Sequence, residues 1–136
     1  MAKDYTVLTS IICDDIRQEA DGKAIIIGVY ARALSVPYFP ITAPTFGVYI
    51  EITGTKHEYN KAVISIRSPD GSEMVRGEST VRIKYLQFPT SLIFKFEAVQ
   101  LKTAGEYKVY LGIDTEPELV STFFVGTREG LISQPA

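Results

Sequence analysis

The stretch FGVYIEIT, residues 46–53, decides the fold class because its side chains alternate between two kinds. The large apolar residues on one parity are Phe46, Val48, Ile50 and Ile52. A period of two places these four side chains on one face of a pleated strand. The stretch therefore predicts a β-strand with one buried face and one wetter face.

The same alternation recurs through the rest of the chain. Runs of β-branched and aromatic residues return after about ten to twelve residues, separated by Gly, Pro, Asp and Ser, which is typical of an all-β sandwich. In residues 92–99, the parity of Leu92, Phe94, Phe96 and Ala98 is predicted to face the core. The sequence predicts an all-β fold, an antiparallel β-sandwich of roughly eight strands.

The N-terminal third is expected to begin with a strand over residues 5–13. Residues 14–22 are predicted to connect it to the next strand through one helical turn, capped by Asp15, and a tight bend. Residues 23–34 contain an apolar run without polar alternation, which predicts a central strand covered on both sides. Gly28 is expected to mark a bulge in that strand.

Prolines and turn residues divide the remaining chain. The three prolines in residues 36–44 predict an unpaired crossover, because proline has no backbone donor. Pro69-Asp70-Gly71-Ser72 supplies the residues that a tight hairpin requires. A weak strand over residues 73–77 and a separate one over residues 81–85 are expected after it. The last strand is placed at residues 119–125.

Length and composition exclude several classes of protein. A chain of 136 residues can bury roughly two thirds of its unfolded surface without disulfides or metals. We expect one domain over residues 1–126 and a loosely attached tail over residues 127–136. The formal charge of −2 gives no electrostatic signature of nucleic-acid binding. With no secretory signal and no apolar membrane span in the sequence, we expect a cytoplasmic protein with no membrane partner.

One short motif carries a structural mechanism. Residues 103–109, TAGEYKV, resemble the stretch that leads into the sixth strand of immunoglobulin-like domains, with Thr103 in place of an acid and Val109 in place of the cysteine. The resemblance implies that Gly105 turns the chain and that the Tyr107 hydroxyl bonds to upstream backbone, the tyrosine corner. Both residues are therefore interpreted as structural. The chain has no tryptophan and only one cysteine, so the resemblance is one of architecture.

A second resemblance covers the first third of the chain. Cys13-Asp14-Asp15-Ile16-Arg17, then Glu19, Gly22-Lys23, Ile27-Gly28-Val29 and Phe39-Pro40 are similar to the opening of a family of small uncharacterised bacterial and phage β-sandwich proteins. The Pro69-Asp70-Gly71 hairpin agrees with the plan of that family. The resemblance implies a fold and leaves the function open.

Candidate catalytic and metal-binding groups are few. Asp14 and Asp15 can be interpreted as a metal or acid/base pair, but adjacent residues of a strand point to opposite faces. Cys13 with His57 can be interpreted as a thiolate pair, but Cys13 lies on the parity of buried residues. We expect a non-enzymatic protein with no metal and no cofactor.

Three segments are candidates for binding a partner. Tyr38 and Phe39 lie between prolines and are either rigid interface anchors or, for Phe39, a plug over the open end of the core. A basic and aromatic face, which is otherwise a solvated strand face, comprises Arg76, Arg82, Lys84 and Tyr85. Residues 120–125 are uncharged and apolar on both parities, so a position at a sheet margin would predict dimerisation through an edge strand.

These observations support one functional hypothesis and two alternatives. The hypothesis is a protein-interaction, assembly or accessory module of bacterial or phage origin, with an unknown protein partner. The first alternative is a module that binds a small anionic ligand or a nucleotide through the basic face or an end cavity. The second alternative is a hydrolytic or metal enzyme.

Overall fold

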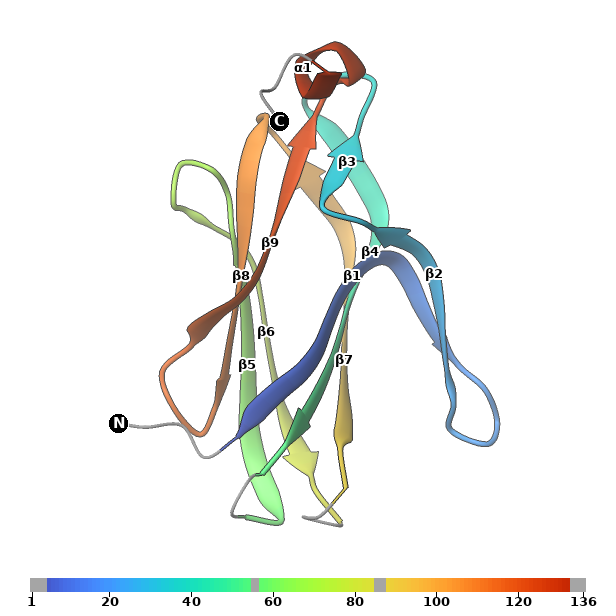
Figure 1. The fold of residues 1–136 in the computed structure, drawn as a ribbon, viewed down its shortest axis with the longest axis vertical. Coiled ribbons are helices and arrows are strands. Elements are labelled where there is room, and N and C mark those ends of the chain that lie inside the picture. The colour runs from blue at the N-terminus through green and yellow to red at the C-terminus, as the bar shows by residue number, and fades with distance from the viewer. Residues whose placement is uncertain (1–4, 55–56, 85–87, 133–136) are drawn as a thin grey trace.

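The computed structural model describes residues 5–54, 57–84 and 88–132, which form two β-sheets and one short helix (Figure 1). The strands are β1 (Thr6–Gln18), β2 (Ala24–Tyr30), β3 (Ala33–Ser35), β4 (Ile41–Thr53), β5 (Tyr59–Arg67), β6 (Glu73–Arg82), β7 (Thr90–Leu101), β8 (Gly105–Ile113) and β9 (Glu118–Gly126). The helix α1 comprises Arg128–Ile132. The predicted all-β sandwich is confirmed.

The order of the strands determines which of them lie at the sheet edges. One sheet has the order β2-β1-β4-β7, and the other has the order β3-β9-β8-β5-β6. Within the described residues, the pairings are antiparallel except that of β3 with β9. The edges are therefore β2 and β7 in the first sheet and β3 and β6 in the second.

The core lies between the two sheets and is built by the alternation seen in the sequence. Phe46, Val48, Ile50 and Ile52 of β4 are all buried, as predicted. An aromatic cluster joins the sheets: the ring of Tyr30 is 5.6 Å from that of Phe46, and Phe123 lies 6.0 Å from both. Burying each large apolar side chain contributes about 1.5–3 kcal/mol to the stability of the fold.

The predicted parity of β7 is wrong at Ala98. Leu92 and Phe94 are buried and the half-buried Phe96 packs against the core, but Ala98 is exposed. Ala98 has a φ of 53°, a left-handed conformation that interrupts the pleat. The buried positions therefore move to the other parity, at Val99 and Leu101.

Two predictions for residues 14–34 are also wrong. Residues 14–18 continue β1 instead of forming a helical turn, and the Asp15 carboxylate accepts hydrogen bonds from the Ile16 amide and from Arg17. The apolar run in residues 23–34 forms β2, which lies at the edge of its sheet and pairs with β1 alone within the described residues. An apolar run without alternation thus marks a partly exposed edge strand here.

Two strand boundaries differ from the sequence prediction. The crossover is confined to residues 36–40, because Ile41 and the residues after it pair with β7. Pro44 is tolerated within β4 because β1 pairs with β4 only up to Gly47. Residues 73–82 form the single strand β6, whereas the sequence predicted two strands, at residues 73–77 and 81–85.

Candidate protein-interaction surface

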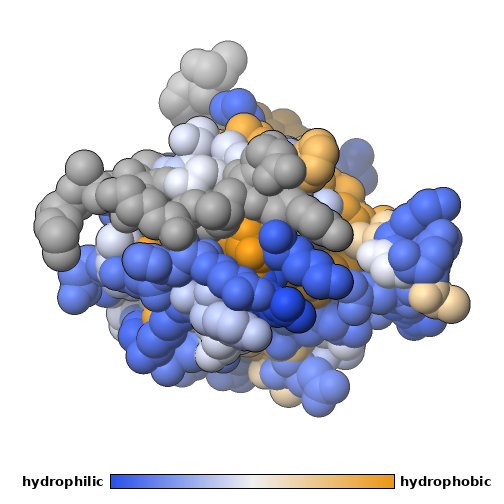
Figure 2. Space-filling model, turned by 90° about the horizontal axis from the view of Figure 1, so that it is seen from below, coloured by the Kyte–Doolittle hydropathy of each residue, from blue (hydrophilic) through white to orange (hydrophobic). Residues whose placement is uncertain are grey.

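The hairpin formed by β1 and β2 projects from the sandwich, and its outer strand exposes aliphatic side chains (Figure 1). Ile25, Ile27 and Val29 have exposed fractions of 43%, 41% and 59%. They occupy alternate positions and are all exposed, and Gly28, between Ile27 and Val29, has a φ of 68° that interrupts the regular pleat. In Figure 2 the polar end of the molecule projects at the right, with hydrophobic surface between it and the body. We call the unpaired side of β2, residues 24–30, the β2 edge.

A tight turn fixes the geometry of this hairpin. The Glu19 amide donates to the Lys23 carbonyl at 2.8 Å, and the Gly22 amide donates to the Glu19 carbonyl at 2.9 Å. The Asp21 carboxylate accepts a hydrogen bond from the Lys23 amide at 3.1 Å, and Gly22 has a φ of 90° that favours glycine. The bend predicted at Asp21-Gly22 is therefore confirmed, and it sets the register of β2 against β1.

Ion pairs tie the middle of the hairpin to the sheet. The Asp15 carboxylate lies 3.1 Å from Lys95 Nζ on β7 and 3.2 Å from Arg17 Nε. Hydrogen bonds from Lys95 and then from Arg17 lower the pKa of Asp15 below its usual value. Asp15 thus holds the projecting ribbon against the outer face of its own sheet.

Asp14 and Asp15 do not converge on a common point. The Asp14 side chain lies against Gly28, where a Cβ would collide with its carboxylate. Burial, and next the negative charge of Asp14, raise the pKa of Tyr30. Within the part of the chain that the structure describes, no group of three or more His, Cys, Asp and Glu side chains is placed to hold a metal ion.

Cys13 is fully buried, and its thiol contacts the carbonyls of Asp15 at 3.4 Å and Gly47 at 3.6 Å. Burial raises the pKa of this thiol to about 11. A thiol with such a pKa remains protonated at neutral pH and is a poor nucleophile. His57 is exposed in the segment that precedes β5, in the opposite sheet. This arrangement favours the interpretation of Cys13 as a small core residue.

The two aromatic residues of the 36–40 segment occupy different environments. Phe39 is half-buried and packs against the core cluster, whereas Tyr38 is 62% exposed. Phe39 also lines a groove of about 580 Å³ at the end of the sandwich, together with Phe124 and Leu131. The structure therefore does not bring Tyr38 and Phe39 together as one exposed pair of anchors.

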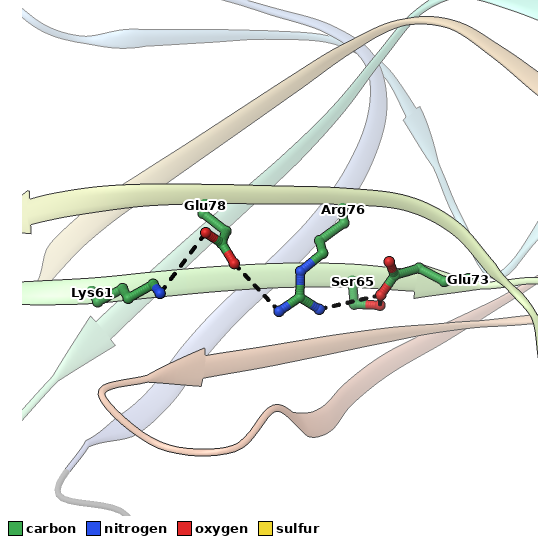
Figure 3. A network of polar contacts seen from close by, with 5 residues as sticks. All are labelled: Lys61, Ser65, Glu73, Arg76 and Glu78. Atoms are coloured by element: carbon green, nitrogen blue, oxygen red, sulfur yellow. Dashed lines mark hydrogen bonds and ion pairs between the residues drawn. The ribbon is translucent and has the colours of Figure 1, made fainter.

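The predicted basic face lies among carboxylates (Figure 3). Arg76 contacts Glu73 and Glu78, each at 3.3 Å, and the Ser65 hydroxyl donates to the same Glu73 carboxylate at 2.7 Å. These contacts, with the Ser65 hydrogen bond the largest cause, lower the pKa of Glu73. Lys61 reaches Glu78 at 3.8 Å. This part of β5 and β6 is a mixed-charge network rather than a basic patch.

The other members of that predicted face are dispersed. Arg82 forms an ion pair with Glu58 at 2.8 Å and lies over the Tyr59 ring at 5.9 Å. Lys84 is exposed just after β6. Tyr85 lies outside the described residues. The arginines are therefore charge-compensated on the protein itself, which weakens their attraction for an anion.

The margin predicted at residues 120–125 is only partly open. These residues lie in β9, which pairs with β8 on one side and with β3 on the other. The three residues of β3 cover β9 from Phe124 to Gly126. Beside the preceding part of β9, the Ser121 hydroxyl is 3.1 Å from that of Ser10 on β1. The margin of β9 is therefore covered from Phe124 onward, and before Phe124 no strand of the described residues pairs with that side. A second uncharged edge lies at β2.

The tyrosine-corner residues adopt the arrangement that the motif implies. The Tyr107 hydroxyl donates to the Thr103 carbonyl at 2.7 Å, and its ring stacks on Phe123 at 5.4 Å. Gly105 has a φ of 139°, and a Cβ there would collide with Pro69. Gly105 and Tyr107 thus shape the end of the sandwich where β8 begins.

The β2 edge was not among the surfaces that the sequence indicated. Its three exposed aliphatic residues sit in a run that hydropathy alone assigns to the interior. The available signal was the tight turn before β2. Such a turn establishes that β2 pairs with β1, but it does not establish a second neighbour on the other side of β2. The position of a strand within its sheet depends on distant segments and is not encoded locally.

Together, the fold and these surfaces define a β-sandwich protein with a projecting hairpin and a mixed-charge second sheet. The chain belongs to a family of unknown function, DUF6941, whose sequence model matches residues 8–126. The match runs from within β1 to the end of β9 and therefore spans both sheets. No curated protein matches the chain. Among the described residues, no helix is long and apolar enough to cross a membrane.

Proposed function

We propose that this protein works through contacts with other protein chains, as a non-enzymatic assembly or accessory module, and that the β2 edge is its contact element. The observation that carries the proposal is the exposure of Ile25, Ile27 and Val29 on a strand that pairs with β1 on one side only. Natural proteins protect free sheet edges with charges, prolines or short strands, because such edges pair readily with other chains. β2 carries neither a charge nor a proline.

The other edges of the sandwich show the protection that β2 lacks. β6 carries four charged side chains, namely Glu73, Arg76, Glu78 and Arg82. β7 carries Lys95 and Glu97, and β3 is only three residues long. The contrast within one molecule supports a role for the β2 edge in binding.

We also propose an immunoglobulin-like architecture for the sandwich. The order β1-β4-β7 corresponds to strands A, B and E of that fold, and β9-β8-β5-β6 corresponds to G, F, C and C′. The tyrosine corner lies in β8, the counterpart of strand F.

We further propose an origin in a bacterium or phage, which the sequence resemblance supports. A cytoplasmic location is supported by the single free cysteine, because disulfides are rare in that compartment.

A capture experiment with a matched pair of variants tests the contact element. Ile27→Lys places a charge in the middle of the β2 edge, and Gln100→Lys places one at an exposed position of β7, the other edge of the same sheet. Immobilised wild-type protein and Gln100→Lys should retain the same proteins from an extract of the source cells, and Ile27→Lys should lose them. Equal retention by all three would contradict the proposed contact element.

The end groove favours a second candidate function, the binding of a small anionic ligand. The groove of about 580 Å³ is lined mainly by apolar residues, with Arg32 among them. This size falls within the range of ligand sites, and a single cation would orient an acidic group. Native mass spectrometry tests this candidate, because a retained ligand adds mass to the 15.1 kDa chain. A spectrum of the bare chain after gentle purification would count against it.

A further inference from the structure

We propose that the partner of the β2 edge is a second copy of this chain, which pairs β2 with β2 in antiparallel fashion about Ile27. The pairing would join the two four-stranded sheets into one sheet of eight strands. This inference rests on the proposed function, since it names the occupant of the same contact element. Three features of the described residues carry it: the free backbone, the side-chain pattern and the contrast with the other edges.

The backbone groups on the unpaired side of β2 can form hydrogen bonds with an extended strand. Antiparallel pairs alternate between hydrogen-bonded and non-bonded positions, and the bond from Glu19 to Lys23 at the turn sets that alternation. The bonded pairs that follow are Arg17 with Ile25, Asp15 with Ile27, and Cys13 with Val29. The amides and carbonyls of Ala24 and Ile26 therefore point to the unpaired side, whereas Gly28, with a φ of 68°, departs from regular strand geometry.

The side chains of β2 are complementary to themselves. Ile27 is the midpoint of Ala24–Tyr30, so a two-fold axis at Ile27 overlaps the whole strand with its copy. Ile27 then faces Ile27, and Ile25 faces Val29, so that aliphatic residues meet. The nearest flanking cations, Lys23 and Arg32, lie outside β2, in the turn and in the bend that leads to β3. No like charges are placed opposite one another, which removes the usual barrier to edge pairing.

The contrast among the edges favours a second copy over a pairing with a different edge. The edge requires a strand with free backbone groups, β-branched side chains at alternate positions and no charge. Within the described residues β2 itself meets all three requirements over its length, whereas β6 and β7 carry charges and β3 has three residues. The uncovered part of β9 begins with the charged Glu118 and ends where β3 pairs at Phe124. Pairing of β2 with β2 is isologous and closes after two copies, so it does not build fibres.

Sedimentation velocity over a concentration range of roughly 1 µM to 1 mM tests the inference. We expect a reversible equilibrium between the 15.1 kDa chain and a species of twice that mass. One strand pair buries a small area, which predicts dissociation on dilution. Ile27→Lys should remain monomeric throughout, and Gln100→Lys should dimerise like the wild type. Melting curves monitored by circular dichroism check that both variants are folded.

Cysteine cross-linking reports on the register directly. In the proposed dimer the two copies of residue 27 face each other as a non-bonded pair, where Cα atoms lie about 4.5 Å apart, within the range of a disulfide. Ile27→Cys should form a disulfide-linked dimer under mild oxidation, and Gln100→Cys should not. The native Cys13 is fully buried, so it does not compete in the folded protein.

The outcomes separate this inference from the proposed function. A wild-type chain that stays monomeric at every concentration, or a dimer that persists in Ile27→Lys, would overturn pairing through β2. If the chain is monomeric and Ile27→Lys still loses proteins in the capture experiment, the β2 edge remains a contact element for another protein. If Ile27→Lys changes neither result, both proposals are wrong.

Discussion

Replacement of Tyr107 by phenylalanine isolates one hydrogen bond of the tyrosine corner. The Tyr107 hydroxyl donates to the Thr103 carbonyl at 2.7 Å, while the ring is buried against Phe123. Tyr107→Phe keeps the ring and removes only the hydroxyl, so we expect a loss of about 0.5–1.5 kcal/mol in the free energy of unfolding. The Thr103 side chain is exposed, which lets water reach its carbonyl and places the loss at the lower end.

Urea denaturation with two comparison variants measures this loss. Tyr107→Ala also removes the buried ring and should lower the free energy of unfolding by about 3–5 kcal/mol, as the truncation of other buried aromatic residues does. Tyr38→Phe removes a hydroxyl from an exposed ring and should leave the midpoint unchanged. With a slope of about 1–3 kcal/mol per molar urea, Tyr107→Phe should lower the midpoint by a fraction of a molar unit to about 1 M. A midpoint for Tyr107→Phe equal to that of wild type, or as low as that of Tyr107→Ala, would refute the reasoning.

Two further predictions concern Asp15 and Cys13, which lie on β1 opposite β2. Asp15 has a lowered pKa in the folded chain, so its ion pairs stabilise the protein above the unfolded pKa of an aspartate, and this contribution disappears as the pH falls through the folded pKa. Asp15→Asn should therefore melt at a lower temperature than wild type at pH 7, with the difference shrinking below about pH 4, and a difference that is constant with pH would contradict the ion-pair account. Cys13 is buried with a pKa of about 11, so Ellman's reagent at pH 8 should label no thiol in the native protein and one thiol per chain in denaturant, and rapid native labelling would show that Cys13 is accessible.

The sequence predicts best those strands in which apolar residues alternate with more polar ones. In β4 the alternation of residues 46–53 identifies both the strand and its buried face, since the period of two is a local property. The same pattern fails in β7 at Ala98, where a left-handed residue reverses the parity. A propensity scale cannot anticipate that conformation, because alanine rarely adopts it.

The candidate site was harder to predict than the fold, because exposure depends on the order of strands. The isoleucines of β2 have the same hydropathy whether the strand lies in the centre of a sheet or at its edge. Arg76 illustrates the reverse difficulty: its charge is visible in the sequence, but its compensation by Glu73 and Glu78 follows from strand pairing. Both errors arise from tertiary contacts that no local pattern contains.

The account depends most on β2 having one bonded side and one free side. Amide hydrogen exchange followed by NMR tests this directly, residue by residue. In a dilute sample, the amides of Ile25 and Ile27 should exchange slowly because they bond to β1, and those of Ala24 and Ile26 should exchange fast. Protection of all these amides to the same degree in the dilute monomer would contradict a free β2 edge.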